Sequence, residues 1–178
     1  MNETEDNGDL FEYTKDLNEL KNKLFDPEQY STLIVANEGE LEGGFDKFFA
    51  FVSSRENIDF KEDALAIFKQ EVSIEAVIDF LNTETDEKKR AQILCTVWEA
   101  GLDATKHIPY WVDCAIKGSF EECIEVLSII ENIETTLDTK EMEAQQQKLN
   151  AVKNLDENAD KSGLLDALEG ALDFLKTY

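Results

Sequence analysis

The sequence predicts an all-helical fold, and three features favour it. Only 2 Pro and 8 Gly interrupt the 178 residues, fewer chain breakers than a sandwich or barrel with many turns requires. Apolar residues recur at steps of three and four, which is the period of a helix with one buried face. A unit of short helix, tight turn and longer helix occurs twice in succession. With 42% hydrophobic residues, the chain can bury a sizeable core.

The chain is expected to consist of a disordered N-terminus, 1–9, and a single helical domain, 10–178. A first amphipathic helix carries a stripe of apolar residues that begins at Leu10 and ends at Leu24. For residues 27–45 the sequence allows a helix, a strand or a loop. The run TLIV within them is typical of a strand, but a single strand has nothing obvious to pair with.

Two aromatic-rich helical segments are expected between Phe45 and Gln70. In the second of them, Asp59 is placed to cap the helix. Ala64 and Phe68 lie on the same expected apolar face, four residues apart. This region is a candidate for a third, degenerate copy of the helix-pair unit.

The first clear copy of the unit spans 73–101. Its short helix is expected to begin at Ser73, a residue type whose side-chain oxygen caps helices. Its longer helix is expected to end at Gly101, because glycine readily adopts the left-handed conformation that terminates helices. The expected buried stripe of the longer helix consists of Ala91, Leu94, Cys95 and Trp98.

The second copy spans 107–134. Its short helix has Pro109 in the first turn and Gly118 at the end. Its longer helix opens with the pair Ser119 and Glu122, the spacing of a capping box. The residues of this helix that we expect to be buried are Phe120, Ile124, Leu127 and Ile130.

The C-terminal segment, 138–178, is expected to form a helical hairpin that caps the stack. Its first helix is polar, with thinly spaced apolar residues: Met142, Leu149, Val152 and Leu155. Its last helix is strongly amphipathic, with an apolar stripe made of Leu164, Leu165, Leu168, Ala171, Leu172 and Leu175. Such a stripe must cover other apolar surface, as the last helix of a repeat stack does.

The two copies align at a shift of 34 residues for the short helices and 33 for the longer ones. At these shifts Leu81 matches Ala115, and Val97 matches Ile130. A helix pair of this length cannot bury its apolar face alone. Stacking of neighbouring pairs makes the core continuous.

The first copy, SIEAVIDFLNTETDEKKRAQILCTVWEAG, resembles HEAT-like repeats of the α-solenoid class. Asp86 and Arg90 stand where such repeats often carry an acidic residue after the turn and an arginine four positions later. The second copy departs from this pattern, with Ser119 and Cys123 at those positions. The resemblance implies a short right-handed α-solenoid of antiparallel helix pairs with a capping C-terminal hairpin. It also implies a protein-binding scaffold without catalysis.

The chain is strongly acidic, with 40 Asp and Glu against 17 Lys and Arg and a net charge of −23. The excess is steepest at the N-terminus, where 1–42 carry 12 acidic and 3 basic residues. Such a surface repels nucleic acid and anionic lipid, so we expect no direct nucleic-acid contact and no membrane contact. It suits a basic protein or peptide as partner, or it serves solubility alone.

Localisation is expected to be cytoplasmic. The start, MNETEDNGDLFEY, is acidic and polar where a signal peptide is basic and then apolar. No apolar run approaches the roughly 20 residues of a membrane helix. The odd number of cysteines, 3, excludes a complete intramolecular disulfide framework and favours reduced thiols.

One stretch, Cys95–Cys123, holds all three cysteines, both tryptophans and the only histidine, His107. No interval among them matches the spacing of a zinc knuckle, two to four residues. The cysteines fall within apolar helical stripes, which favours core packing over a Cys₃His metal site or a reactive thiol. His107 is more typical of a helix start than of a ligand. We therefore expect no metal site and no cofactor.

These features are compatible with three functions. The favoured one is a non-catalytic interaction scaffold that binds a basic protein or peptide on one face of successive second helices. The alternative is an acidic mimic of nucleic acid, or an immunity-type inhibitor of a basic toxin. An enzyme using His107 or a cysteine is disfavoured, because no phosphate loop, nucleophile elbow or other catalytic motif appears. The sequence does not set the oligomeric state.

The candidate partner-binding residues are Glu87, Glu99, Tyr110 and Trp111.

Overall fold

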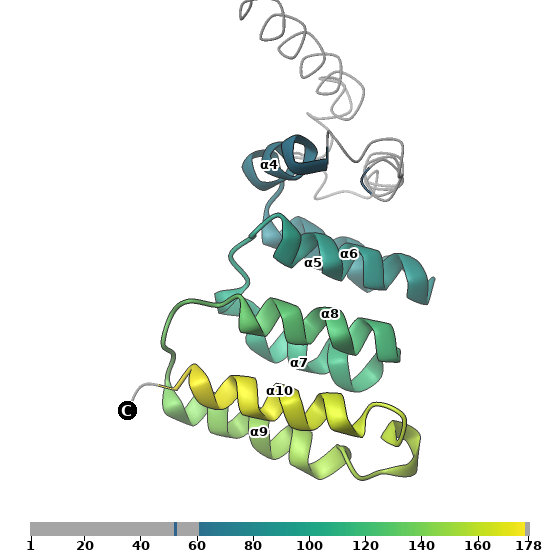
Figure 1. Ribbon diagram of the computed structural model, residues 1–178, viewed down its shortest axis with the longest axis vertical. Coiled ribbons are helices and arrows are strands. Elements are labelled where there is room, and N and C mark those ends of the chain that lie inside the picture. Colours follow the sequence, from purple (N-terminus) through teal and green to yellow (C-terminus); the bar gives the residue numbers. More distant parts are fainter. Residues whose placement is uncertain (1–51, 53–60, 177–178) are drawn as a thin grey trace, which may run out of the picture. The chain divides into compact units, whose positions relative to one another are not determined.

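The computed structural model describes residue 52 and residues 61–176, apart from the side chains of 63, 67 and 71. Every regular element in these ranges is a helix, as predicted (Figure 1). The expectations for 1–9, for the first helix and for 27–45 lie outside the described residues. The chain divides into two compact units, Met1–Val72 and Ser73–Tyr178.

In the first unit the structure describes one complete helix, α4, over Lys61–Glu71. Ala64 and Phe68 are both buried, and this confirms the predicted apolar face. Leu65, next to Ala64, is buried as well.

Three helical hairpins in succession make up the described part of the second unit, 73–176. Their elements are α5 (Ile74–Thr83) and α6 (Glu87–Glu99); the 3₁₀ turn η2 (Thr105–His107), α7 (Ile108–Lys117) and α8 (Phe120–Glu131); then α9 (Thr139–Val152), the 3₁₀ turn η3 (Asp156–Asn158) and α10 (Ser162–Phe174). The second helix of each hairpin packs on the next, so that α8 contacts α6 and α10. The first helices α7 and α9 also pack together (Figure 1).

The predicted helix starts are confirmed by side-chain caps. Ser73 Oγ accepts a hydrogen bond from the Ala76 N–H at 3.2 Å, and α5 begins at the next residue. Ser119 Oγ accepts from the Glu122 N–H at 3.3 Å at the start of α8. Each cap satisfies a backbone donor that has no partner within the helix.

The predicted end of α6 is also confirmed. Gly101 has a φ of 65°, the left-handed conformation that side chains disfavour. The turn is closed by hydrogen bonds from the Gly101 N–H to the Trp98 carbonyl and from the Leu102 N–H to the Val97 carbonyl, both 3.0 Å. This geometry fixes where α6 stops and allows the chain to turn toward α7.

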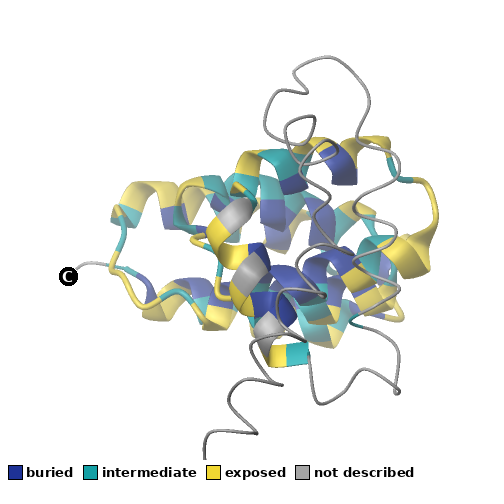
Figure 2. Ribbon diagram, turned by 90° about the horizontal axis from the view of Figure 1, so that it is seen from above, coloured by how far each residue is buried: buried dark blue, intermediate teal, exposed yellow. Residues whose placement is uncertain are grey.

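Each helix of the second unit has buried residues on one side and exposed residues on the other (Figure 2). Positions that the repeat alignment matches are buried together: Leu81 and Ala115 have no exposed surface, nor do Val97 and Ile130. The last helix α10 buries most of its predicted stripe, but Leu164 and Ala171 are only half-buried. The residues of this helix and its end that are buried are Leu165, Leu168, Leu172 and Leu175.

The buried faces of the two longer helices differ from the predicted ones. On α6, Leu94 is buried as expected, but its buried neighbours are Ile93 and Val97. The other members of the predicted stripe, Ala91, Cys95 and Trp98, are only half-buried. The reason is that α6 packs against both α5 and α8, which moves the centre of the buried arc.

On α8 the prediction that Phe120 and Ile124 are buried is wrong, because these side chains are 40% and 38% exposed. Leu127 is half-buried, and only Ile130 of the predicted set is fully buried. Three helices, α6, α7 and α10, surround α8 and cover a different arc. The residues of α8 that this arc buries are Glu122, Cys123, Val126, Ile129 and Ile130.

A buried lysine joins the third hairpin to the second. Lys161, just before α10, is 5% exposed. Its ammonium donates hydrogen bonds to the carbonyls of Ala115 at 3.0 Å and Ile116 at 2.9 Å, and to that of Gly118. These carbonyls belong to the C-terminal end of α7, where unpaired acceptors and the helix dipole favour a cation.

Candidate functional site

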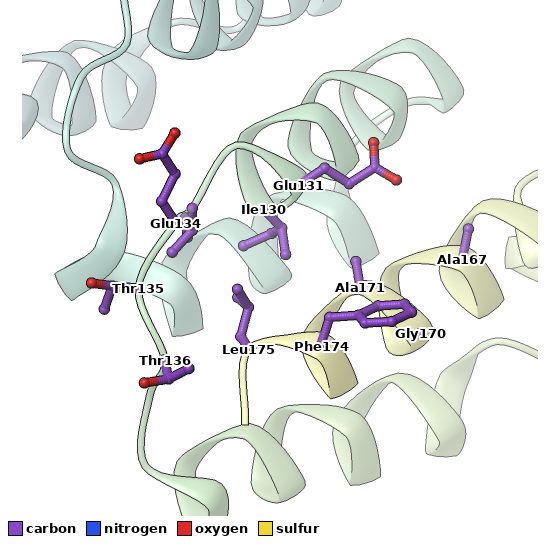
Figure 3. A pocket seen from close by; sticks show the side chains of 11 residues that line it. Ile130, Glu131, Glu134, Thr135, Thr136, Ala167, Gly170, Ala171, Phe174 and Leu175 are labelled. Atoms are coloured by element: carbon purple, nitrogen blue, oxygen red, sulfur yellow. The ribbon is translucent and has the colours of Figure 1, made fainter. Parts of the chain in front are cut away.

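An open cavity of about 390 Å³ lies between the C-terminal ends of α8 and α10 (Figure 3). This volume is within the range of small-molecule and side-chain pockets, roughly 300–1,000 Å³. The end of α8 and the loop after it contribute Ile130, Glu131, Ile133 and Glu134, among others. The α10 wall consists of Ala167, Gly170, Ala171 and Phe174, and Leu175 follows it.

The walls of the cavity are fixed by hydrogen bonds. Asn132 caps α8 and donates from Nδ2 to the Ser128 carbonyl at 2.8 Å. The loop is tied to the end of α10, where the Leu137 N–H donates to the Leu175 carbonyl at 2.7 Å. The first bond fixes the end of α8, and the second holds the loop against the end of α10.

Phe174 is the most exposed large apolar side chain in the part of the chain that the structure describes. Its exposed fraction is 88%. It shares a face of α10 with Ala171 and Gly170, three and four residues earlier, and this face is turned away from the buried Leu172. Figure 3 shows its ring at the edge of the cavity beside Gly170. Exposed aromatic side chains of this kind are frequent anchors in protein interfaces.

Gly170 leaves space over the α10 wall. A Cβ at this position would meet no other side chain and no other part of the chain within 4 Å. A glycine inside a helix destabilises it by about 0.5–1 kcal/mol relative to alanine. No close contact in the described structure requires glycine here, and the surface of α10 is open at this position.

The rim of the cavity is acidic. Glu131 at the end of α8 and Glu134 in the following loop are both exposed. None of the lining residues, all of which the structure describes, is basic. In a chain of net charge −23, this rim attracts cations and repels anions.

Two of the predicted partner-binding residues, Glu87 and Glu99, are the first and last residues of α6. At 1.5 Å per residue they are about 18 Å apart along the helix. Glu87 is exposed and Glu99 is half-buried. Neither residue lines the cavity. Their role in binding stays a prediction.

The other two predicted residues, Tyr110 and Trp111, are adjacent on α7 and differ in exposure. The Tyr110 ring is half-buried, and its hydroxyl donates to Asn82 Oδ1 at 3.1 Å. Burial raises the pKa of Tyr110 above its usual range. Trp111 has no exposed surface, and its indole N–H donates to the Ala104 carbonyl at 3.0 Å. As a correction to the prediction, Trp111 therefore belongs to the core and offers no contact area to a partner.

The cysteines pack mainly as small apolar side chains, as predicted. Cys114 and Cys123 are buried, and burial raises the pKa of both thiols, that of Cys123 to about 11. Cys95 is half-buried. His107 precedes α7, as expected of a helix start, and its Nε2 lies 3.4 Å from Glu75 Oε1 without hydrogen-bond geometry. Among the described residues, no three His, Cys, Asp or Glu side chains are grouped to hold a metal ion.

Sequence reasoning missed Phe174 and Gly170, although each carried a signal. Phe174 is a large aromatic residue that falls off the apolar stripe of an amphipathic helix. Gly170 is a glycine inside a helical pattern, where it lowers helix propensity relative to alanine. Glu131 and Glu134 carried no signal, because acidic residues occur throughout the chain.

Within 61–176, no helix combines the length and the apolarity needed to cross a membrane. No family model, curated protein or solved structure matches the chain.

Proposed function

We propose that this chain is a non-catalytic protein-interaction module that binds a basic protein or peptide through its acidic surface. In this proposal the second unit is a short right-handed α-solenoid of HEAT-like helix pairs, closed by the α9–α10 hairpin. The module works in the cytoplasm and needs no cofactor.

The series of contacts between hairpins supports the solenoid. The second helices pack in the order α6, α8, α10, and the first helices α7 and α9 pack together. Polar interactions also connect successive hairpins. Arg90 of α6 forms an ion pair with Glu122 of α8, and Lys161 donates hydrogen bonds to carbonyls at the end of α7. In repeat proteins each unit is stabilised mainly by its neighbours.

The observation that carries the binding proposal is the open apolar cavity with an acidic rim and an exposed Phe174 at its edge. A large charge of one sign speeds the encounter with an oppositely charged partner. Affinity then comes from a few well-packed anchors. The cavity and Phe174 form the apolar part of such an interface, and the surrounding carboxylates attract the basic partner.

The test is capture from lysate on the immobilised full chain at low salt, with elution by stepwise increases in salt. The expected result is retention of a specific basic protein, which is released as salt screens the attraction. The control is an unrelated acidic domain of similar net charge. If both resins retain the same proteins, the chain acts only as a generic polyanion and the proposal fails.

Competition with nucleic acid decides between the proposal and acidic mimicry. If the captured protein binds DNA or RNA and nucleic acid displaces it from the chain, the chain occupies a nucleic-acid site. If nucleic acid leaves the complex intact, the chain binds elsewhere on its partner, as the scaffold proposal expects.

A further inference from the structure

We propose that the cavity between α8 and α10 is the docking site for a basic segment of the partner protein. One bulky apolar side chain of that segment enters the cavity beside Phe174, and neighbouring Lys or Arg side chains pair with Glu131 and Glu134. This inference rests on the proposed function and names the site and the chemistry of the partner.

The shape and composition of the cavity point to an apolar anchor. Its α10 wall is made of the small residues Ala167, Gly170 and Ala171, and the half-buried Ile133 lines its α8 side. Desolvating such surfaces by an inserted side chain is favourable in proportion to the apolar area buried. The hydrogen-bonded loop at the mouth lowers the ordering cost of docking.

Gly170 leaves room for this anchor. A Cβ built on it would meet no other side chain and no other part of the chain within 4 Å, so the surface of α10 is open at this point.

Phe174 supplies the second apolar contact. Its side chain is 88% exposed at the edge of the cavity, so a docked segment can cover it while its anchor fills the space over Gly170. Covering its exposed ring is favourable in proportion to the apolar area removed from water.

Charge complementarity selects a basic segment as the occupant. A second copy of the chain would bring another −23 charges toward the acidic rim. The chain's own N-terminal residues, 1–42, carry 12 acidic and 3 basic residues and are repelled in the same way. Lys and Arg beside the anchor instead meet Glu131 and Glu134 at the rim, where such pairs favour encounter and register.

The experiment selects peptides from a phage-displayed library of random linear sequences. The bait is the full chain, and binders to the Gly170→Leu variant are removed. Leucine fills the open space over α10 and is a strong helix former, so this variant is expected to fold. Peptides that bind the wild-type chain but not the variant should share a bulky apolar residue next to Lys or Arg. If no peptide distinguishes the two proteins, the proposal is overturned.

Selected peptides are then synthesised with a fluorescent label, and their affinity is measured by anisotropy. Gly170→Leu and Phe174→Ala are each expected to weaken binding about tenfold or more. The matched controls are Gly163→Leu, another glycine of α10 with open space, and Leu155→Ala, another exposed apolar side chain. Equal losses in the control variants would overturn the assignment of the cavity.

The charge requirement is tested on the same peptides. The double change Glu131→Gln and Glu134→Gln is expected to weaken binding and to reduce its salt dependence. The control is Glu143→Gln with Glu157→Gln, which removes two exposed carboxylates elsewhere in the second unit. The proposal of a basic segment is overturned if the selected peptides lack basic residues. It is also overturned if the control variant loses as much peptide affinity as the Glu131→Gln, Glu134→Gln variant.

Two other results separate this inference from the proposed function. If lysate capture yields a specific basic protein whose binding is unchanged by Gly170→Leu, docking occurs elsewhere on the acidic surface. The function then stands and the cavity assignment falls. If sedimentation shows that the wild-type chain self-associates and Gly170→Leu does not, the occupant is a second copy and the inference is wrong.

Discussion

The backbone of Gly118 lies directly against the carboxylate of Glu122, four residues later. A Cβ on Gly118 would come within 2.5 Å of Glu122 Oε2 and 2.6 Å of the Cys114 carbonyl oxygen. The φ of Gly118 is −81°, a value that every residue adopts. Glycine is therefore required for space at this turn and not for backbone freedom.

The same substitution should have opposite effects at two glycines. Gly118→Ala is expected to lower the free energy of unfolding by about 1–3 kcal/mol, because the added carbon displaces a buried carboxylate. Gly170→Ala is expected to raise it by about 0.5–1 kcal/mol, because helix propensity improves without a clash. Urea unfolding followed by tryptophan fluorescence measures both, since Trp98 and Trp111 report on the second unit. Equal effects at the two positions would contradict the packing described for the turn.

Arg90 neutralises Glu122 between two hairpins. Arg90 Nε lies 3.0 Å from Glu122 Oε2, and the Glu122 side chain is 1% exposed. Arg90→Met is expected to cost about 3–5 kcal/mol, because it leaves a buried carboxylate without its partner. Changing both residues to Met should restore part of the loss. Lys88→Met, at an exposed position of α6, is the control, and a loss of equal size there would show that the ion pair is not the cause.

Lys161 is expected to stabilise the junction between the second and third hairpins. Lys161→Met removes the donor that the carbonyls of Ala115, Ile116 and Gly118 share. Hydrogen bonds to charged groups contribute about 1.5–3 kcal/mol, so a loss of this order in the free energy of unfolding is expected. The control is Lys140→Met, at an exposed position of α9. A neutral result for Lys161→Met would mean that water replaces the ammonium at no cost.

The buried thiol of Cys123 should make stability depend on alkaline pH. Burial raises its pKa to about 11 in the folded protein, above the value of about 8.5 for a free thiol. Below both values the thiol is protonated in both states and its contribution to stability is fully present. As pH rises from about 9 to 11 the unfolded state loses the proton first, so the free energy of unfolding falls. Unfolding at several pH values should show a smaller fall for Cys123→Ala than for wild type.

A thiol reagent gives a second measure of the same burial. In the native protein Cys95, which is half-buried, should react faster than Cys114 and Cys123, which are buried. All three should react quickly in denaturant. Rapid native labelling of Cys123 would contradict its place in the core.

Helix ends were predictable because the interactions that set them are local. Ser73 and Ser119 cap the helices that follow them, and Gly101 ends α6, all within a few residues of chain. Buried faces were less predictable where a helix is apolar on several sides. On α8, Phe120 and Cys123 both fit an apolar stripe, and only packing against three helices decides that Cys123 is the buried one.

The candidate site depended on relationships that a single sequence does not display. The cavity brings the end of α8 against α10, elements separated by a whole helix. Trp111, one of the two aromatic candidates for partner binding, is buried by the packing of α7, whereas Phe174, which was not a candidate, is 88% exposed on α10.

The central place of α8 has a consequence for biosynthesis. Its neighbours α6, α7 and α10 come from all three hairpins, and α10 is the last of these to be translated. Until α10 leaves the ribosome, the surface of α8 that Leu165, Leu168 and Leu172 help to cover remains in water. The second unit can therefore complete its fold only after α10 has left the ribosome, and until then the nascent chain exposes apolar surface that favours aggregation.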